Sequence, residues 1–311
     1  MNTNVLDICQ INVRSLNNEK IDAIKAEMLS EYDVICLTET NLPTARVDDL
    51  NLNGFHPLIR KDRVGKTGGG VGMYIANHLG ITQQFNFEIP QLEALWVKVK
   101  AGNNIVLICV CYRPPNAKAE FWTKLQDSID IAKQSGIEKI ILTGDFNADP
   151  NTREGHFLKL FTLSNNLSLH ITEPTRITPT SATILDQFIS NIPCSLRNVE
   201  VLDPISTCDH CPIRASVFLK HKFNKPKCYQ RHIWQYNLAD FDLFRQQLGS
   251  VDWNICLEGD IDESCLRWTT TFLNIARQCI PNKVVTIRPN DQLFFTPELK
   301  KEIKKEKNRM H

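Results

Sequence analysis

Short stretches of apolar residues alternating with polar ones recur through the first 218 residues. From Val5 to Val13 the alternation has the period of two that a half-buried β-strand requires. Similar stretches follow, each ended by polar residues, glycine or proline. The predicted strands are Val5–Val13, Asp33–Leu37, Gly68–Ala76, Leu92–Val99, Asn104–Tyr112, Lys139–Thr143, Leu169–Ile171, Ile184–Ile189, Val199–Leu202 and Ile213–Leu219. The three between Gly68 and Tyr112 follow one another directly and are predicted to form an antiparallel block.

Apolar residues at helical spacing separate some of these strands and predict three amphipathic helices. The first set is Ile21, Ile24, Met28 and Leu29. The second set is Phe121, Leu125, Ile129 and Ala132. The third set is Phe157, Leu160, Phe161 and Leu163. Many strands with few helices favour two packed β-sheets with the helices outside them.

The pattern changes after Leu219. Residues 220–239 are polar and basic and contain proline, which is typical of a linker. Residues 240–311 carry two apolar helical stripes and a third predicted helix that starts near Pro297. This segment is predicted to be a helical extension, too small for an independent core, that stops within a helical pattern as though it had been cut. The predicted division is therefore 1–219, 220–239 and 240–311.

Composition places the chain among ordinary globular proteins. It has 311 residues, of which 42% are hydrophobic and 23% charged, and its net charge is +1. The longest apolar stretch, Ile105–Tyr112, is far shorter than the roughly 20 residues of a membrane-spanning helix. No secretory signal is recognisable at the N-terminus. Residues 219–311 carry 16 Lys and Arg against 11 Asp and Glu; this basic segment suits nucleic-acid contact or a solvated helix face.

The 11 cysteines do not predict a disulfide framework, because their number is odd and no signal peptide is seen. Cys208 and Cys211, with His210 between them, have the spacing of a zinc half-site. A structural zinc site needs four ligands, and no second pair at matching spacing occurs in the sequence. Zinc is therefore not expected. Two glycine-containing motifs, at residues 65–67 and 68–72, precede a strand rather than a helix, so they indicate a flexible turn and not a phosphate-binding loop.

Polar residues stand at the ends of several predicted strands, where a cleft on a sheet scaffold would find its functional groups. They are Asn12, Glu39, Tyr112, Asp145, Asn147, Asp186, Asp209 and His210. Taken singly, each is explained as well by a solvated loop end. The GDFN segment places a carboxylate beside an amide, but a local Asx-turn would use the same residues.

The order and local context of this set resemble the endonuclease/exonuclease/phosphatase superfamily, and within it the apurinic-type endonuclease domains of non-LTR retrotransposons. The resemblance covers about residues 5–219 and rests on QINVRSL, LTET, CYRPPN, GDFNAD, ILDQFIS and CDH. The later segments CIPNKVVTIRP and LFFTPELKKEIKKEKNR resemble the connector that leads to a reverse transcriptase in such elements. That polymerase is not among these residues. The resemblance implies an α/β fold, a four-layered sandwich of two mixed β-sheets flanked by helices.

The resemblance also implies Mg²⁺, or Mn²⁺ in its place, as the cofactor, and it implies a role for each candidate residue. Catalytic roles fall to Asp145 as the base, Asn147 on a phosphate oxygen, His210 oriented by Asp186, and Tyr112. The implied metal ligands are Glu39, Asn12 and Asp209, and the implied substrate contacts are Arg14, Thr175 and Arg113. Two positions depart from the family pattern, because Arg14 replaces an aspartate of the repair enzymes and Cys208 replaces a serine. Arginine cannot bind a metal, so Arg14 is expected to face a DNA phosphate or an acidic neighbour.

The leading hypothesis is a Mg²⁺-dependent DNA endonuclease that nicks one strand and works inside the cell, in the nucleus. A second hypothesis keeps the fold and changes the substrate to a phospholipid, an inositol phosphate or RNA. A third is an inactive retroelement remnant that only binds nucleic acid. DNA is the expected partner in the first and third cases, and a membrane is not.

Overall fold

The protein is described from a computed structural model. The description covers residues 2–43, 50–65, 67–205, 208–225, 229–257 and 259–287. The described residues divide into two compact units, one within residues 2–225 and the other within residues 229–287, and each is described by itself. In the part of the chain described, no helix is long and apolar enough to cross a membrane.

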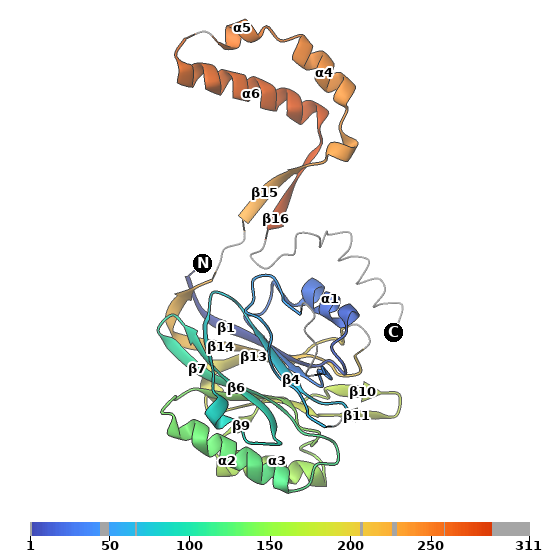
Figure 1. Ribbon diagram of the computed structural model, residues 1–311, viewed down its shortest axis with the longest axis vertical. Helices are drawn as coiled ribbons and strands as arrows, with labels where there is room; N and C mark the ends of the chain where they lie inside the picture. Colours follow the sequence, from blue (N-terminus) through green and yellow to red (C-terminus); the bar gives the residue numbers. More distant parts are fainter. Residues whose placement is uncertain are drawn as a thin grey trace. The chain divides into compact units, whose positions relative to one another are not determined.

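The first unit contains two six-stranded β-sheets (Figure 1). One sheet has the strand order β13-β14-β1-β2-β4-β3. Within it β1 runs parallel to β2, and the other neighbours are antiparallel. Its strands are β1 (Asn2–Asn12), β2 (Val34–Thr38), β3 (Ile59–Lys61), β4 (Val71–Ile75), β13 (Leu196–Val201) and β14 (Ile213–Asn224).

The other sheet has the order β5-β6-β7-β8-β12-β9, in which only β7 and β8 are parallel. Its strands are β5 (Gly80–Gln83), β6 (Glu93–Ala101), β7 (Asn104–Tyr112), β8 (Ile140–Asp145), β9 (Ser168–Leu169) and β12 (Asp186–Ser190). A separate hairpin consists of β10 (Arg176–Thr178) and β11 (Ser181–Thr183). The antiparallel block predicted between Gly68 and Tyr112 is wrong in one respect, because β4 belongs to the first sheet while β6 and β7 pair in the second. Alternation shows which side chains are buried, and it does not show which strand lies next to which.

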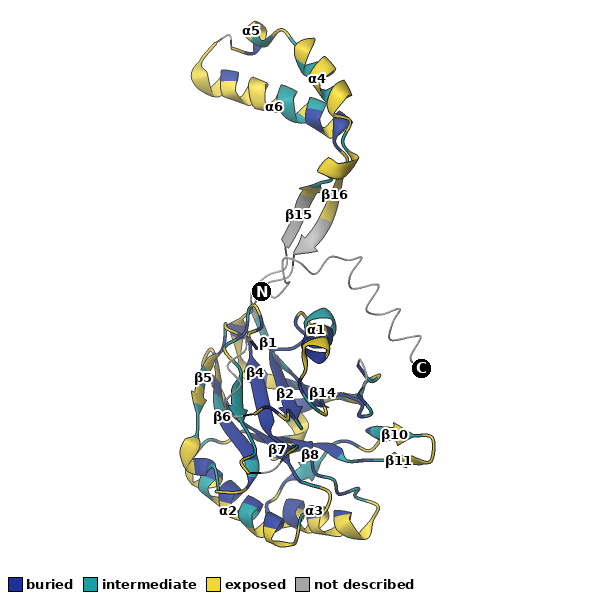
Figure 2. Cartoon of the chain, turned by 45° about the vertical axis from the view of Figure 1, so that its right-hand side comes forward, coloured by how far each residue is buried: buried dark blue, intermediate teal, exposed yellow. Residues whose placement is uncertain are grey.

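Helices cover the outer face of each sheet (Figures 1 and 2). Helix α1 (Asn18–Glu27) begins at Asn17, whose side chain accepts a hydrogen bond from the backbone of Lys20, and it packs on the first sheet. Helices α2 (Glu120–Gln134) and α3 (Arg153–Ser164) pack on the second sheet. Two short 3₁₀ turns, η1 (Phe85–Phe87) and η2 (Pro193–Ser195), complete the unit. The result is helix, sheet, sheet and helix, which confirms the predicted sandwich.

The second unit is a two-stranded ribbon that carries a helical hairpin. Its elements are β15 (Tyr229–Trp234), η3 (Tyr236–Leu238), α4 (Phe241–Gly249), α5 (Trp253–Cys256), α6 (Ile261–Cys279) and β16 (Asn282–Ile287). Phe272 of α6 contacts Phe244 of α4, with ring centres 5.8 Å apart. Strand β14 runs into the predicted linker and β15 begins within it, so regular structure occupies part of residues 220–239. The helix predicted near Pro297 lies outside the described residues.

Candidate active site

Strand alternation brings the candidate residues into the space between the two sheets. In β1, Leu6 and Ile8 belong to the core between the sheets, so Gln10 and Asn12, which continue the period of two, point the same way. In β8, Ile141 lies in this core and Asp145 follows on the same face. The polar side chains therefore occupy one end of the inter-sheet layer, where the apolar core stops.

The second sheet places two of its carboxylates side by side. Strands β8 and β12 pair in a register that sets Asp145 opposite Asp186. Tyr112, the last residue of β7, is the neighbour of Asp145 on the other side through the parallel β7–β8 pairing. Three strand ends thus contribute adjacent functional groups from a single hydrogen-bonded ladder.

Asn12 links the two sheets at this site. Its Nδ2 donates to Glu39 Oε1 and to Asp145 Oδ2, each at 2.9 Å. The orientation of the amide is fixed because the backbone N–H of Arg14 donates to Asn12 Oδ1 at 3.0 Å. Glu39 directly follows β2 with a φ of 52°, a left-handed conformation that turns the chain at this point. Two carboxylates are therefore held on either side of one amide.

The GDFN segment forms both the Asx-turn and the site that its residues suggested. The backbone N–H of Asn147 donates to Asp145 Oδ1 at 2.9 Å, and its Nδ2 donates to Asp145 Oδ2 at 3.1 Å. Asn147 Nδ2 also donates to the carbonyl of Arg113 at 2.8 Å, so both amide hydrogens of this side chain are engaged. Asn147 therefore orients Asp145, and its contact with a phosphate oxygen stays a prediction.

Electrostatics make Asp145 an unusual carboxyl. It is fully buried, and this burial raises its pKa. The charge of Asp186 raises the pKa further, while His210 and the hydrogen bonds from Asn147 and Asn12 oppose the rise. A carboxyl with a raised pKa is a stronger base once ionised, which suits proton abstraction from water.

Asp186 and His210 form a buried dyad. His210 Nδ1 lies 2.7 Å from Asp186 Oδ2, and the hydroxyl of Thr175 donates to the same oxygen at 2.8 Å. Burial lowers the pKa of His210, but the carboxylates of Asp186, Asp145 and Asp209 outweigh this and raise it to about 9. His210 is therefore protonated at neutral pH. Because Nδ1 is bound to Asp186, Nε2 remains for a substrate.

Gln10 is a member of this network that the sequence did not reveal. Its Nε2 donates to Asp186 Oδ1 at 3.1 Å and to the hydroxyl of Thr38 at 3.3 Å, and the side chain is fully buried. Asp186 therefore receives a donor on each oxygen. The available signal was position, since Gln10 lies two residues before Asn12 and shares its face of the strand.

A second network supports Tyr112. The guanidinium of Arg63 lies 5.6 Å from the centre of the Tyr112 ring, and Arg63 Nε donates to Glu93 Oε1 at 2.7 Å. The backbone N–H of Gly70 donates to the other oxygen of Glu93 at 2.6 Å. The glycine motif interpreted as a flexible turn thus holds Glu93 and, through it, Arg63. Burial, then the charges of Glu39 and Asp145, raise the pKa of Tyr112, so its phenol stays protonated.

The side chains expected to contact substrate differ in exposure. Thr175 and Arg113 are buried, and Arg113 donates to the carbonyls of Asn147 and Ala117. Thr175 and Arg113 therefore support the site from its buried side. Arg14 is exposed and lies 3.7 Å from Asp209 Oδ2. Its direct contact with a phosphate stays a prediction, as does that of the two buried residues.

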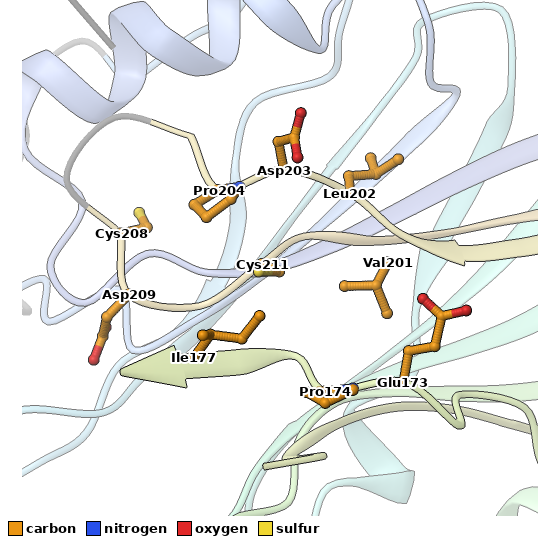
Figure 3. A pocket seen from close by; sticks show the side chains of 10 residues that line it. All are labelled: Glu173, Pro174, Ile177, Val201, Leu202, Asp203, Pro204, Cys208, Asp209 and Cys211. Carbon is orange, nitrogen blue, oxygen red and sulfur yellow. The ribbon is translucent and has the colours of Figure 1, made fainter. Parts of the chain in front are cut away.

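Asp209, expected to bind metal, is engaged elsewhere. Arg176 Nε and Nη2 lie 3.0 and 2.9 Å from Asp209 Oδ2. Burial raises the pKa of Asp209, but Arg176, His210 and Arg14 outweigh this and lower it. A pocket beside the dyad has Asp209 on its rim (Figure 3). Two further carboxylates, Glu173 and Asp203, line this pocket with mainly apolar neighbours, so its chemistry does not suit a phosphate.

The donor set fits a divalent cation near Asn12. Within the described residues, one group of His, Cys, Asp and Glu side chains has metal-ligating geometry, namely Asp145, Asp186 and His210, whose atoms all lie within 4.8 Å of one another. Asp186 already accepts hydrogen bonds from Gln10 and Thr175 and lies 2.7 Å from His210 Nδ1, so this trio is better described as a hydrogen-bonded centre. Glu39 and Asp145, which both accept from the Asn12 amide, offer the hard oxygen donors that Mg²⁺ prefers.

A sandwich of two mixed sheets with this arrangement of carboxylates and histidine defines the class of metal-dependent phosphoester hydrolases. Residues 9–207 match the Endonuclease/Exonuclease/phosphatase family, and the chain belongs to it. Members of this family depend on a divalent metal. No curated protein matches the chain.

Solved structures share the fold at low identity. The endonuclease domain of TRAS1, a telomere-specific non-LTR retrotransposon, is 13% identical, with a TM-score of 0.58 over 70% of this chain and 99% of that one. The AP endonuclease LMAP from Leishmania major is 14% identical, with a TM-score of 0.59 over 69% and 88%. The catalytic domain of APE2 from Xenopus laevis is 14% identical, with a TM-score of 0.54 over 71% and 94%. At such identities the likeness concerns the fold.

Proposed function

We propose that the chain is a Mg²⁺-dependent DNA endonuclease of retrotransposon origin, which hydrolyses one phosphodiester bond and leaves 3′-hydroxyl and 5′-phosphate ends. The observation that carries the proposal is the convergence of Asp145, Asp186 and His210 at one end of the inter-sheet layer. The likeness to the TRAS1 endonuclease domain and to AP endonucleases supports DNA as the substrate. A DNA substrate in turn favours a nuclear location, and the element of origin would supply a reverse transcriptase.

Asp145 and His210 have separate roles in the proposed reaction, Asp145 as the general base and His210 as a hydrogen-bond donor to the phosphate. Asp145, oriented by Asn147 and Asn12, accepts a proton from the attacking water. His210, held through Nδ1 by Asp186, donates from Nε2 to a non-bridging phosphate oxygen. Tyr112 offers a protonated phenol to the phosphate or to the leaving oxygen.

Glu39 and Asn12 are the residues that would hold the cation, next to Asp145. Bound there, Mg²⁺ or Mn²⁺ supplies positive charge that offsets the charge of the phosphate. The Asn12 amide donates to both carboxylates and so keeps Glu39 and Asp145 close to each other. Asp209 remains a predicted ligand, and it would have to leave Arg176 to act as one.

Nicking of supercoiled plasmid tests the proposal. The purified chain should convert supercoiled to open-circular DNA with Mg²⁺, EDTA should stop the reaction, and His210→Ala should abolish it. His156→Ala, which alters an exposed histidine on α3, is the matched control and should nick normally. Equal nicking by His210→Ala and the control would reject the assignment.

The same preparation separates the alternative functions. Hydrolysis of an inositol phosphate, a phospholipid or RNA without plasmid nicking would indicate a same-fold phosphoesterase. DNA binding without cleavage in Mg²⁺ or Mn²⁺ would indicate an inactive remnant. The hydrogen-bonded geometry around Asp145 and His210 supports an active enzyme over the remnant.

A further inference from the structure

The second unit exposes more large hydrophobic side chains than the first, although it has far fewer residues. Of the nineteen large hydrophobic side chains that are exposed in the described residues, eleven belong to this small unit. Figure 2 shows helix α6 exposed along most of its length. Three of the eleven, Ile261, Leu266 and Trp268, lie on α6.

Helix α6 has two distinct faces. One packs inside the unit, where Trp268 contacts Trp253, Phe272 contacts Phe244, and Cys279 lies 3.6 Å from Gln247 Oε1. The other face lies roughly 130° around the helix, at about 100° per residue. It carries the α6 stripe, which we define as Asp262, Leu266, Thr269, Thr270, Leu273 and Arg277.

The residues of the α6 stripe are spaced symmetrically about the midpoint between Thr269 and Thr270, and only the signs of the two end charges differ. Asp262 precedes Leu266 by the same spacing with which Arg277 follows Leu273. The four side chains fall within about 60° of one another around the axis. Leu266 is 68% exposed, and the charged residues at both ends are exposed as well. The two threonines at the midpoint are small enough to allow close approach of another helix.

We propose that α6 pairs antiparallel with α6 of a second copy of this chain through the α6 stripe. A two-fold axis between Thr269 and Thr270 sets Leu266 beside the partner's Leu273. The same axis sets Asp262 beside the partner's Arg277, and symmetry repeats each contact. Opposite charges thus meet at both ends of the paired helices, outside the leucine contacts, which specifies the antiparallel direction. The pairing does not depend on the proposed nuclease activity.

Charge reversal at the two ends gives a sharp test by sedimentation equilibrium of the full chain. The wild type should dimerise in a concentration-dependent way. Asp262→Arg and Arg277→Asp should each weaken self-association about tenfold or more, because like charges then meet twice per dimer. An equimolar mixture of the two variants should recover near wild-type affinity, since every contact in the heterodimer is again between opposite charges.

Arg267→Asp is the matched control, because it makes the same charge change on the same helix outside the α6 stripe. It should leave the dissociation constant within about threefold of wild type. Leu266→Ala tests the contact between Leu266 and the partner's Leu273 without altering charge, and it should also weaken the dimer. Far-ultraviolet circular dichroism establishes that each variant keeps its helices.

Three results would overturn the proposal. One is a wild-type chain that stays monomeric up to about 100 μM, a concentration at which a dimer with a micromolar Kd would form. Another is a dimer that the charge reversals do not weaken, because it would then form through another surface. The third is a mixture of the two variants that associates no better than either alone.

Discussion

Replacing Asp186 by asparagine removes the charge that sustains the protonated form of His210 and keeps the size of the side chain. Burial by itself lowers the pKa of His210, and Asp186 is the largest influence in the opposite direction. A pKa of about 9 against the ordinary 6.5 corresponds to roughly 3 kcal/mol in favour of the imidazolium. Most of this should disappear in Asp186→Asn, so the pKa of His210 should fall to its ordinary value or below.

The sign of the pH effect follows from the direction of the shift. In the wild type the imidazolium is complete below the ordinary pKa and is lost as the pH rises through about 9, so nicking should decline there. In Asp186→Asn the decline should occur near or below pH 6.5. At pH 7.5 about one tenth or less of the variant would be protonated, so its nicking rate should fall at least about tenfold.

Single-turnover plasmid nicking between about pH 5.5 and 9.5 measures this decline directly. Asp127→Asn, which changes an exposed carboxylate on α2, serves as the matched control and should keep the wild-type profile. If Asp186→Asn kept a descending limb near pH 9, the argument that Asp186 maintains the charge of His210 would fail.

Three further outcomes are expected. Mg²⁺ at ten times its Kd should stabilise the fold by about 1.4 kcal/mol in a thermal-shift assay. Glu39→Gln should reduce this gain in stability, and an equal gain in the variant would place the cation elsewhere. Gln10→Met should lower kcat for nicking about tenfold or more with little change in KM, because one oxygen of Asp186 loses its donor; an unchanged kcat would contradict this. Gly144→Ala should cost about 1–3 kcal/mol or more in denaturant unfolding, because its Cβ would lie 1.8 Å from the carbonyl oxygen of Cys111. Wild-type stability of that variant would contradict the geometry.

Much of the fold follows from the period-two pattern of the sequence. The alternation in β1 and the continuous apolar stretch in β7 identified these strands and placed Asn12 and Tyr112 at their ends. Four short strands, β3, β5, β10 and β11, escaped prediction because a few residues carry too little pattern. The assignment of β4 to the first sheet also escaped, because strand partners depend on the whole topology.

The candidate site, like the fold, was predicted in part from the sequence. Asp145, Asp186 and His210 were all named from sequence, and the structure brings them together. Gln10 and Arg63 were not named, because a buried amide in a strand and an arginine in a loop look ordinary in one dimension. Their partners, Asp186 and Tyr112, lie far away along the chain, and only the packing of the two sheets brings them into contact.

The pairing of β8 with β12 has a consequence for how such an enzyme can change. The spacing between the proposed base, Asp145, and the carboxylate partner of His210, Asp186, follows from the register of the β8–β12 pair. Apart from Asn147 and Thr175, which hold Asp145 and Asp186, the intervening segment with α3 and the tip of the β10–β11 hairpin can therefore lengthen, shorten or acquire new side chains while the reaction centre keeps its dimensions. New target preferences can arise in that segment without rebuilding the chemistry.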